Sequence, residues 1–224
     1  MNGWSLKTDW SNADKEALTF GEVDSLCECF IETEQGLLVP RGYEDFGHTD
    51  TSVRIGGELR DLRPISLREE QVPAVQAMMD NLTRPGLGAI LFAPCGKGKT
   101  VMGLEMIRRL GRKALVLVHK SFLVDQWIER ANTFLPEAKV GLWQRDIIPT
   151  GDEDIIIGMV QSIVNPRRKY PKEIYDMFGT LVADETHRYG APMWQEAISN
   201  FKAGYRIGLT ATPERKDKLH DVFY

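Results

Sequence analysis

The fold of this chain is decided by residues 87–100, which read Leu-Gly-Ala-Ile-Leu-Phe-Ala-Pro-Cys-Gly-Lys-Gly-Lys-Thr. Apolar residues 89–92 have the composition of a strand that is buried on both faces, as strands of parallel sheets are. The run is interrupted at 93–98, and apolar residues return with helical spacing from Lys99 onwards. A strand that leads through a glycine-containing loop into a helix opened by Lys-Thr predicts a phosphate-binding site.

The loop supplies the groups that such a site needs. Gly96 and Gly98 permit backbone conformations that side chains exclude, so several N–H groups can converge on one anion. The following helix adds its positive dipole end. We expect Lys99 to reach the β- and γ-phosphates of a nucleotide and the Thr100 hydroxyl to ligate Mg²⁺; the alternative is a glycine-rich turn with a surface lysine. The residues expected around the phosphates are Pro94, Cys95, Gly96, Lys97, Gly98, Lys99 and Thr100.

Composition restricts the class of protein. A chain of 224 residues, 42% hydrophobic and 27% charged, can bury the core of one large domain, or of one domain with a small companion. The net charge of −4 gives no global basic field, so any nucleic-acid contact must be a local face. Three cysteines without an obvious framework indicate a reducing compartment. Neither a signal peptide nor an apolar run of about 20 residues is recognisable, so we expect a cytoplasmic protein without a membrane partner.

The first 63 residues differ in texture from the rest of the chain. Apolar clusters at 26–31 and 36–40 flank Glu34-Gln35-Gly36, which predicts a β-hairpin. We therefore predict a small β-rich accessory module at 1–63, followed by the main domain at 64–224. The alternative is that the first 63 residues extend the main sheet.

Strands and helices alternate from residue 64 onwards. Ser66 is a candidate N-cap with Glu69 as its capping-box partner, which predicts that a helix begins at this point. Further strands are expected at 113–118, 140–143, 154–160, 180–183 and 206–209, and helices at 122–131, 171–178 and 193–201. This alternation predicts an α/β fold with a parallel sheet covered by helices on both faces.

A nucleotide site of this kind needs a second, acidic element for its metal ion and its attacking water. Asp184-Glu185-Thr186-His187 follows the apolar run at 180–183, at the carboxyl end of a strand, where ligand sites of parallel sheets lie. Asp184 would hold Mg²⁺ through its water shell, and Glu185 would polarise the attacking water. The alternative is that the two acids form a helix N-cap.

Three strings together resemble motifs I, II and III of superfamily 2 helicases, namely residues 93–100, Asp184-Glu185-Thr186-His187 and Thr210-Ala211-Thr212-Pro213. Three further segments resemble family motifs: 67–71 the adenine-recognising segment, 116–127 motif Ia, and 158–162 the T-x-Q-S motif. The string Gly-Leu-Thr-Ala-Thr-Pro-Glu-Arg at 208–215 resembles the branch that XPB-like repair helicases share with phage helicases and restriction-enzyme translocases. The resemblance covers residues 64–224.

The resemblance implies the first RecA-like domain of a helicase, which uses ATP and Mg²⁺ and acts on DNA, with RNA the less favoured partner. It implies catalytic roles for Lys99, Asp184 and Glu185, metal ligation by Thr100 and Asp184, and recognition of the adenine base by Gln71. The other residues that it implies are Arg68 in nucleotide binding, His187, Thr210 and Thr212 in coupling, and Lys120, Ser121, Gln161 and Ser162 in nucleic-acid contact.

Three departures from the family pattern stand out. Ala93 occupies the first position of the phosphate loop, where the strict pattern has glycine, as in a variant loop found among helicases. Thr186 replaces the commoner alanine of motif II, and we expect this change to be tolerated because the position faces away from the phosphates in the family. We expect the second RecA-like domain of such enzymes to be missing from this chain, which stops at Tyr224, and the isolated chain to be poorly active.

The favoured hypothesis is the ATP-binding half of an ATP-dependent DNA helicase or translocase. One alternative is a module that binds ATP and nucleic acid without hydrolysis. Another is a small-molecule P-loop kinase, which would leave the Gln71 segment and Thr210-Ala211-Thr212 unexplained. The basic run at 167–169 fits either phosphate contact or a solvated face. Trp127 and Trp143 could stack on bases, but burial in the core is the better expectation for both.

Overall fold

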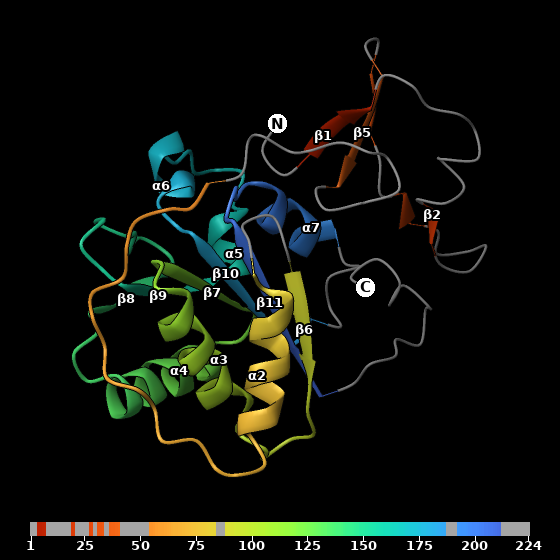
Figure 1. Ribbon diagram of the computed structural model, residues 1–224. Helices are drawn as coiled ribbons and strands as arrows, with labels where there is room; N and C mark the ends of the chain where they lie inside the picture. The colour runs from red at the N-terminus through yellow and green to blue at the C-terminus, as the bar shows by residue number, and fades with distance from the viewer. Residues whose placement is uncertain are drawn as a thin grey trace.

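The computed structural model describes residues 54–83, 88–186 and 192–211, together with five short strands nearer the N-terminus (Figure 1). These strands are β1 (Trp4–Lys7), β2 (Thr19–Phe20), β3 (Cys27–Glu28), β4 (Ile31–Thr33) and β5 (Gly36–Pro40). They pair antiparallel in the orders β1-β5-β4 and β2-β3. Thr33 of β4 lies opposite Gly36 of β5, as a hairpin around Glu34-Gln35-Gly36 requires.

The main sheet has six strands within the described residues, and all of its neighbouring strands run parallel. The strands are β6 (Gly88–Phe92), β7 (Ala114–Val118), β8 (Val140–Trp143), β9 (Ile155–Met159), β10 (Thr180–Asp184) and β11 (Tyr205–Thr210). Their order is β6-β11-β10-β7-β9-β8. The last strand in sequence, β11, therefore lies between β6, which leads into the phosphate loop, and β10, which ends at Asp184. The predicted parallel α/β fold is confirmed.

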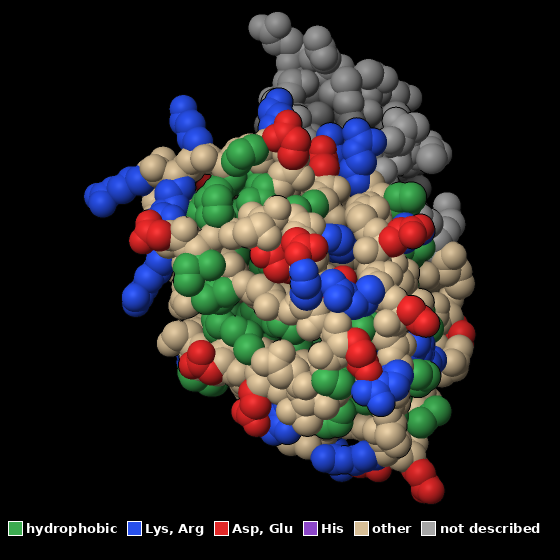
Figure 2. Space-filling view, turned by 90° about the vertical axis from the view of Figure 1, so that its left-hand side faces the viewer, with side chains coloured by type: hydrophobic (Ala, Val, Ile, Leu, Met, Phe, Trp, Pro, Cys, Tyr) green, Lys and Arg blue, Asp and Glu red, His purple; other side chains and the backbone are tan. Residues whose placement is uncertain are grey.

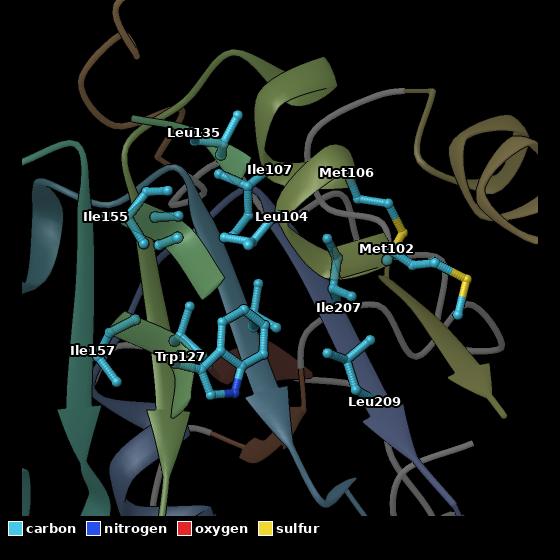
Figure 3. Close-up of a cluster of buried hydrophobic side chains, with 14 of the residues drawn as sticks. Met102, Leu104, Met106, Ile107, Trp127, Leu135, Ile155, Ile157, Ile207 and Leu209 are labelled. Carbon is cyan, nitrogen blue, oxygen red and sulfur yellow. The ribbon is translucent and has the colours of Figure 1, made fainter. Parts of the chain in front are cut away.

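Helices cover both faces of this sheet, which is why its central strands are apolar throughout. One face carries α2 (Val72–Asn81), α3 (Lys99–Leu110) and α4 (Ser121–Phe134), and the other carries α5 (Val160–Ile163), α6 (Lys172–Asp176) and α7 (Pro192–Ser199). Successive strand residues alternate between the two cores: Val116 packs with α3 and α4, whereas Leu115 packs toward α5 and α7. Figure 3 shows the first of these cores, with Trp127 among its apolar side chains. In the part of the chain that the structure describes, no helix is both long and apolar enough to cross a membrane.

Both tryptophans that could have stacked on bases are fully buried, which confirms the expectation of core positions. Trp143 lies in an aromatic cluster on the second face of the sheet. Its ring stands nearly perpendicular to that of Tyr170 at 5.0 Å and to that of Phe201 at 6.1 Å, the edge-to-face arrangement that aromatic pairs favour. Neither tryptophan is available to a nucleic acid.

The predicted start of the first helix is wrong. The helix begins at Val72, with Gln71 at the N-cap position, rather than at the capping box of Ser66 and Glu69. The cause is Pro73, which has no N–H to donate to the carbonyl of residue 69 and whose ring would clash with it, so a helix cannot run through from Ser66. At the second helical position, proline is tolerated because no intrahelical donor is needed there.

Residues 54–63, which the sequence assigned to the N-terminal module, pack against the main sheet and its helices. The Gly57 N–H donates to Met177 at 2.9 Å, and the Gly57 carbonyl accepts from the Lys113 N–H at 2.8 Å. Gly56 has a φ of 61° and lies so close to the Gly179 backbone that no side chain would fit. Leu62 belongs to the first core. We therefore infer that the main domain begins before residue 64.

Glu105 of α3 is 2% exposed and is the centre of a hydrogen-bond network that joins α3 to the Ile65 segment and, through Arg109, to α2. Its carboxylate accepts hydrogen bonds from the guanidinium groups of Arg108 and Arg109 at 2.7–2.8 Å and from the Ile65 N–H at 3.2 Å. Arg109 also donates to Gln76 of α2 at 3.2 Å. Burial alone would raise the pKa of Glu105, but the hydrogen bonds from Arg108, Arg109 and the Ile65 N–H outweigh it and keep the pKa below its ordinary value.

Replacing Glu105 with glutamine should lower the free energy of unfolding by about 1–3 kcal/mol at neutral pH, because two guanidinium groups lose their shared partner. Since folding lowers the pKa of Glu105, its stabilisation is present above the unfolded value near 4.5 and is lost as the pH falls through the folded value. Urea unfolding should therefore show a large difference between wild type and variant near neutral pH, and this difference should shrink as the pH is lowered below about 4.5. Glu129→Gln, on the exposed side of α4, is the matched control. A difference that does not change with pH would contradict the assignment.

Candidate active site

The phosphate loop adopts the backbone conformation that its glycines were expected to allow. Gly96 and Gly98 have φ values of 80° and 79°, in the left-handed region that favours glycine. Gly98 is also the N-cap of α3, so the loop leads directly into the N-terminus of this twelve-residue helix. A Cβ atom added to Gly96 would meet no described atom within 4 Å. The loop therefore leaves open space at the positive end of the α3 dipole, as an anion site requires.

Lys99 lies across the base of this loop. Its Nζ atom donates to the Ala93 carbonyl at 2.9 Å, so the ammonium group closes the loop from its last residues to its first. Thr100, the next residue, is half-buried in the first turn of α3. Lys99 and Thr100 therefore both lie where α3 begins, next to the loop that is predicted to hold the phosphates.

Asp184 is the last residue of β10 and is only 7% exposed. Its Oδ2 atom accepts a hydrogen bond from Trp127 Nε1 at 2.9 Å, and its Oδ1 atom accepts one from the Glu185 N–H at 3.0 Å. Burial raises the pKa of Asp184, and the negative charge of Glu185 raises it further, while the hydrogen bond from Trp127 and the charge of Lys99 act in the opposite direction. A cation beside this carboxylate would favour its ionised form.

Glu185 has a φ of 60°, an uncommon conformation for a residue other than glycine. The left-handed turn directly after β10 is an outlier of the kind that clusters at functional sites. Thr186, the next residue, is fully buried, and its hydroxyl donates to the carbonyls of Ala183 at 3.0 Å and Leu209 at 3.2 Å. This is how the fold accommodates threonine where alanine is commoner in the family pattern.

Strand β11 connects the two motifs. Its last residue, Thr210, is paired with Phe92 at the end of β6, and the Thr210 carbonyl accepts a hydrogen bond from the Ala93 N–H at 3.0 Å. On the other side of β11, Leu209 is paired with Asp184 of β10. The phosphate loop and Asp184 therefore lie on opposite sides of the end of β11, the loop beside Thr210 and the aspartate beside Leu209. The order of the parallel strands brings the phosphate loop, Asp184 and Thr210 together, although some 85 residues of sequence separate the loop from Asp184.

The side chain of Gln71 is buried against the phosphate loop. It is 4% exposed, its Nε2 atom donates to the Lys97 carbonyl at 2.9 Å, and its Oε1 atom accepts from the Arg68 N–H at 3.0 Å. A side chain at Gly98 would collide with the Gln71 amide. The Arg68 side chain is largely exposed and lies 4.0 Å from Glu70. Gln71 is thus beside the predicted nucleotide site, and recognition of adenine by Gln71 stays a prediction.

The residues predicted to contact nucleic acid fall into two groups. Lys120 and Ser121 are exposed at the start of α4, and Gln161 is exposed on α5, where its Nε2 atom donates to the His119 carbonyl at 2.9 Å. These three lie after the carboxyl ends of the neighbouring strands β7 and β9. Ser162 differs, because α5 turns it inward and its hydroxyl accepts from the Arg145 N–H at 2.9 Å. This geometry argues against a direct contact by Ser162.

The charges on one face of the molecule are mixed. Figure 2 shows the side of the molecule on which β8 lies, with acidic and basic side chains interspersed and a few Lys or Arg side chains extending from one edge. Within the basic run at 167–169, the Arg168 guanidinium is engaged by Asp146 at 2.6 Å. This face carries no single-sign field, in keeping with the net charge of −4.

Two of the predicted coupling residues, His187 and Thr212, lie outside the described residues. The sequence did not predict the hydrogen bond between Trp127 and Asp184, because the pattern around Trp127 indicates only base stacking or burial in the core. The two residues are 57 positions apart, and their spacing carries no signal of a contact. The contact arises from the packing of α4 on the sheet.

A left-handed phosphate loop at the start of α3, held beside a buried aspartate by an intervening parallel strand, defines a RecA-like P-loop ATPase domain. Residues 64–215 match the family described as "Type III restriction enzyme, res subunit". The chain belongs to this family, and residues 64–215 form a RecA-like domain of the kind found in superfamily 2 helicases and translocases.

Relatives in curated collections are similar in sequence to the same part of the chain. Helicase-like protein 055L of Frog virus 3 (isolate Goorha) is 34% identical over 167 residues, covering 73% of this chain and 37% of that protein. The DNA 3'-5' translocase XPB2 of Sulfurisphaera tokodaii is 30% identical over 159 residues, covering 71% of this chain and 34% of that protein. The chain thus spans little more than a third of these relatives.

Solved structures share the fold at lower identity. The UvsW helicase from bacteriophage T4 is 16% identical, with a TM-score of 0.66, over all of this chain and 94% of that one. The SWI2/SNF2 ATPase core of Sulfolobus solfataricus, solved in complex with double-stranded DNA, is 21% identical, with a TM-score of 0.56, over 74% of this chain and 36% of that one.

Proposed function

We propose that this chain is the ATP-binding half of an ATP-dependent DNA helicase or translocase, in which ATP hydrolysis drives movement on DNA once a second RecA-like domain is joined to it. The observation that carries the proposal is the attachment of the phosphate loop and Asp184 to the same end of β11. A small-molecule kinase would not need this third motif, and the helicase relatives do not favour it.

Each residue at this site would have a separate role in phosphoryl transfer to water. The loop N–H groups and Lys99 would hold the β- and γ-phosphates, and Lys99 would exchange its bond to Ala93 for the phosphate oxygens. The Thr100 hydroxyl and the Asp184 carboxylate are hard oxygen donors of the kind that Mg²⁺ prefers. When bound there, Mg²⁺ would supply positive charge to the phosphate oxygens. Glu185 would orient the attacking water and accept its proton, which the left-handed turn after β10 supports.

DNA is the proposed track, with RNA as the less favoured one. The archaeal relative is named a DNA translocase, and the SWI2/SNF2 core was solved with double-stranded DNA. Against this, a protein of Acanthamoeba polyphaga mimivirus that is 26% identical over 198 residues is described as a candidate ATP-dependent RNA helicase. A comparison of matched DNA and RNA strands at one salt concentration would decide between them.

The nucleotide part of the proposal is tested by titrating the chain with a fluorescent ADP analogue, with and without Mg²⁺. We expect saturable binding that Mg²⁺ tightens, with displacement by unlabelled ATP. If Gln71 recognises adenine, unlabelled GTP should displace the analogue less well than ATP does. Absence of saturable binding in the folded protein would refute the proposed function.

The nucleic-acid part predicts a specific role for Lys120. Lys120→Ala should weaken DNA binding at low salt and reduce the slope of log K against log salt by about 0.7–0.9, because one phosphate contact is lost. Arg130→Ala is the matched control, because it removes an exposed positive charge further along the same helix. Fluorescence anisotropy over a range of salt concentrations measures both. If the slope of log K against log salt were the same for Lys120→Ala and Arg130→Ala, Lys120 would not be a specific phosphate contact.

A further inference from the structure

Within the described residues, Trp127 donates a side-chain hydrogen bond to Asp184 from outside motif II. The residue lies on α4, is fully buried, and directs its Nε1 atom to Asp184 Oδ2 at 2.9 Å. In Figure 3 the ring stands among apolar side chains, with the indole nitrogen on the side of the carboxyl ends of the strands. A side chain of the hydrophobic core therefore donates a hydrogen bond to the predicted metal ligand, Asp184.

The surrounding residues hold the ring in place. Gly103 of α3 faces Trp127 so closely that an added Cβ atom would lie 3.1 Å from the ring carbon Cη2, and 3.1 Å from Leu209 Cδ1. Leu209 belongs to β11 and is paired with Asp184 in the sheet. The indole is therefore enclosed by the helix that follows the phosphate loop and by the strand beside the aspartate. It cannot rotate away from Asp184 without moving one of them.

The chemistry of the indole suits a positioning role. Its N–H is a neutral donor that can neither ligate a metal nor accept a proton, so it can hold one carboxylate oxygen without competing for the cation. The other oxygen accepts the Glu185 N–H, and the two bonds together determine the orientation of the carboxylate plane. Partners of this kind commonly tune the affinity of a metal ligand.

We propose that Trp127 is the positioning residue that holds the Asp184 carboxylate in the orientation needed for Mg²⁺. The inference rests on the proposed function, because it takes Asp184 as a ligand of the nucleotide-bound metal. It assigns to Trp127, the last residue of the segment that resembles motif Ia, a direct effect on the metal requirement of nucleotide binding.

The test is a Mg²⁺ titration of ADP affinity in the wild-type chain and in Trp127→Phe, which keeps the ring in the core but removes the N–H. The variant should need roughly tenfold more Mg²⁺ for half of the tightening, while its affinity for ADP in EDTA stays unchanged. The matched control is Trp143→Phe. Trp143 is also fully buried, but its indole N–H has no hydrogen-bond partner among the described residues, so its loss should not change the Mg²⁺ requirement.

A second route uses Gly103→Ala, which keeps the indole N–H but pushes on the ring, and should raise the Mg²⁺ requirement in the same direction. This variant replaces Trp127→Phe if the latter fails to fold by circular dichroism. In an Asp184→Asn background, Trp127→Phe should have no further effect on the Mg²⁺ requirement.

The outcomes separate this inference from the function on which it rests. If the wild-type chain binds ADP more tightly with Mg²⁺ but Trp127→Phe and Gly103→Ala need no more Mg²⁺ than Trp143→Phe, Trp127 is only a core residue and the inference is wrong. If Mg²⁺ has no effect on wild-type affinity, the proposed metal site and this inference both fail.

Discussion

Replacing Lys99 with alanine should weaken ATP binding at least tenfold, which corresponds to about 1.4 kcal/mol. The lysine lies across the base of the phosphate loop, with its ammonium group 2.9 Å from the Ala93 carbonyl. A charge-assisted contact with phosphate oxygens is roughly twice as strong as a neutral hydrogen bond. Isothermal titration calorimetry in the presence of Mg²⁺ measures the loss directly.

The control for this variant is Lys172→Ala, which removes an exposed positive charge at the start of α6, on the opposite face of the sheet. It should leave the affinity within experimental error of the wild type. Thermal unfolding without nucleotide checks that loss of the Lys99–Ala93 hydrogen bond has not unfolded the loop region. Equal affinities of wild type and Lys99→Ala, in two folded proteins, would refute the assignment of the loop.

The parallel sheet could be predicted because its signals are local. A strand such as Ala114–Val118 is covered on both faces and must be apolar throughout, which no exposed segment imitates. The phosphate loop is equally local, because the left-handed conformations of Gly96 and Gly98 depend on the absence of a side chain. These local signals are sufficient to predict the parallel fold and the conformation of the phosphate loop.

Other features could not be predicted because they depend on packing between distant segments. The start of α2 was placed at Ser66 on a capping pattern, and the steric effect of Pro73 overrode it. Ser162 was expected on the nucleic-acid track from a motif, yet the short helix α5 turns its hydroxyl toward Arg145. The hydrogen bond between Trp127 and Asp184 depends on how α4 packs beside the end of β10. The sequence of either segment alone does not determine this packing.

A polypeptide of these 224 residues should bind ATP with Mg²⁺ yet hydrolyse it at a barely detectable rate, even with DNA present. Phosphoryl transfer of this kind needs positive charge opposite the phosphate loop, and an arginine finger contributes roughly 10³- to 10⁵-fold in rate. The arginines of the motif-bearing segments are poor candidates. Arg68 is largely exposed beside Glu70 on the segment before α2, and Arg215 follows motif III in the sequence, outside the segments that contact the nucleotide in the family pattern.

Supplying the second RecA-like domain of a full-length relative, fused or in trans, should therefore raise turnover by roughly 10³-fold or more. Glu185→Gln should abolish that turnover and leave nucleotide bound, because the amide cannot accept the proton of the attacking water. A coupled assay of ADP release measures the rate, and filter binding of labelled ATP measures occupancy. Rapid DNA-stimulated turnover by residues 1–224 alone would contradict this prediction. It would indicate that a second copy of the chain supplies the arginine, in which case the specific activity should rise with protein concentration.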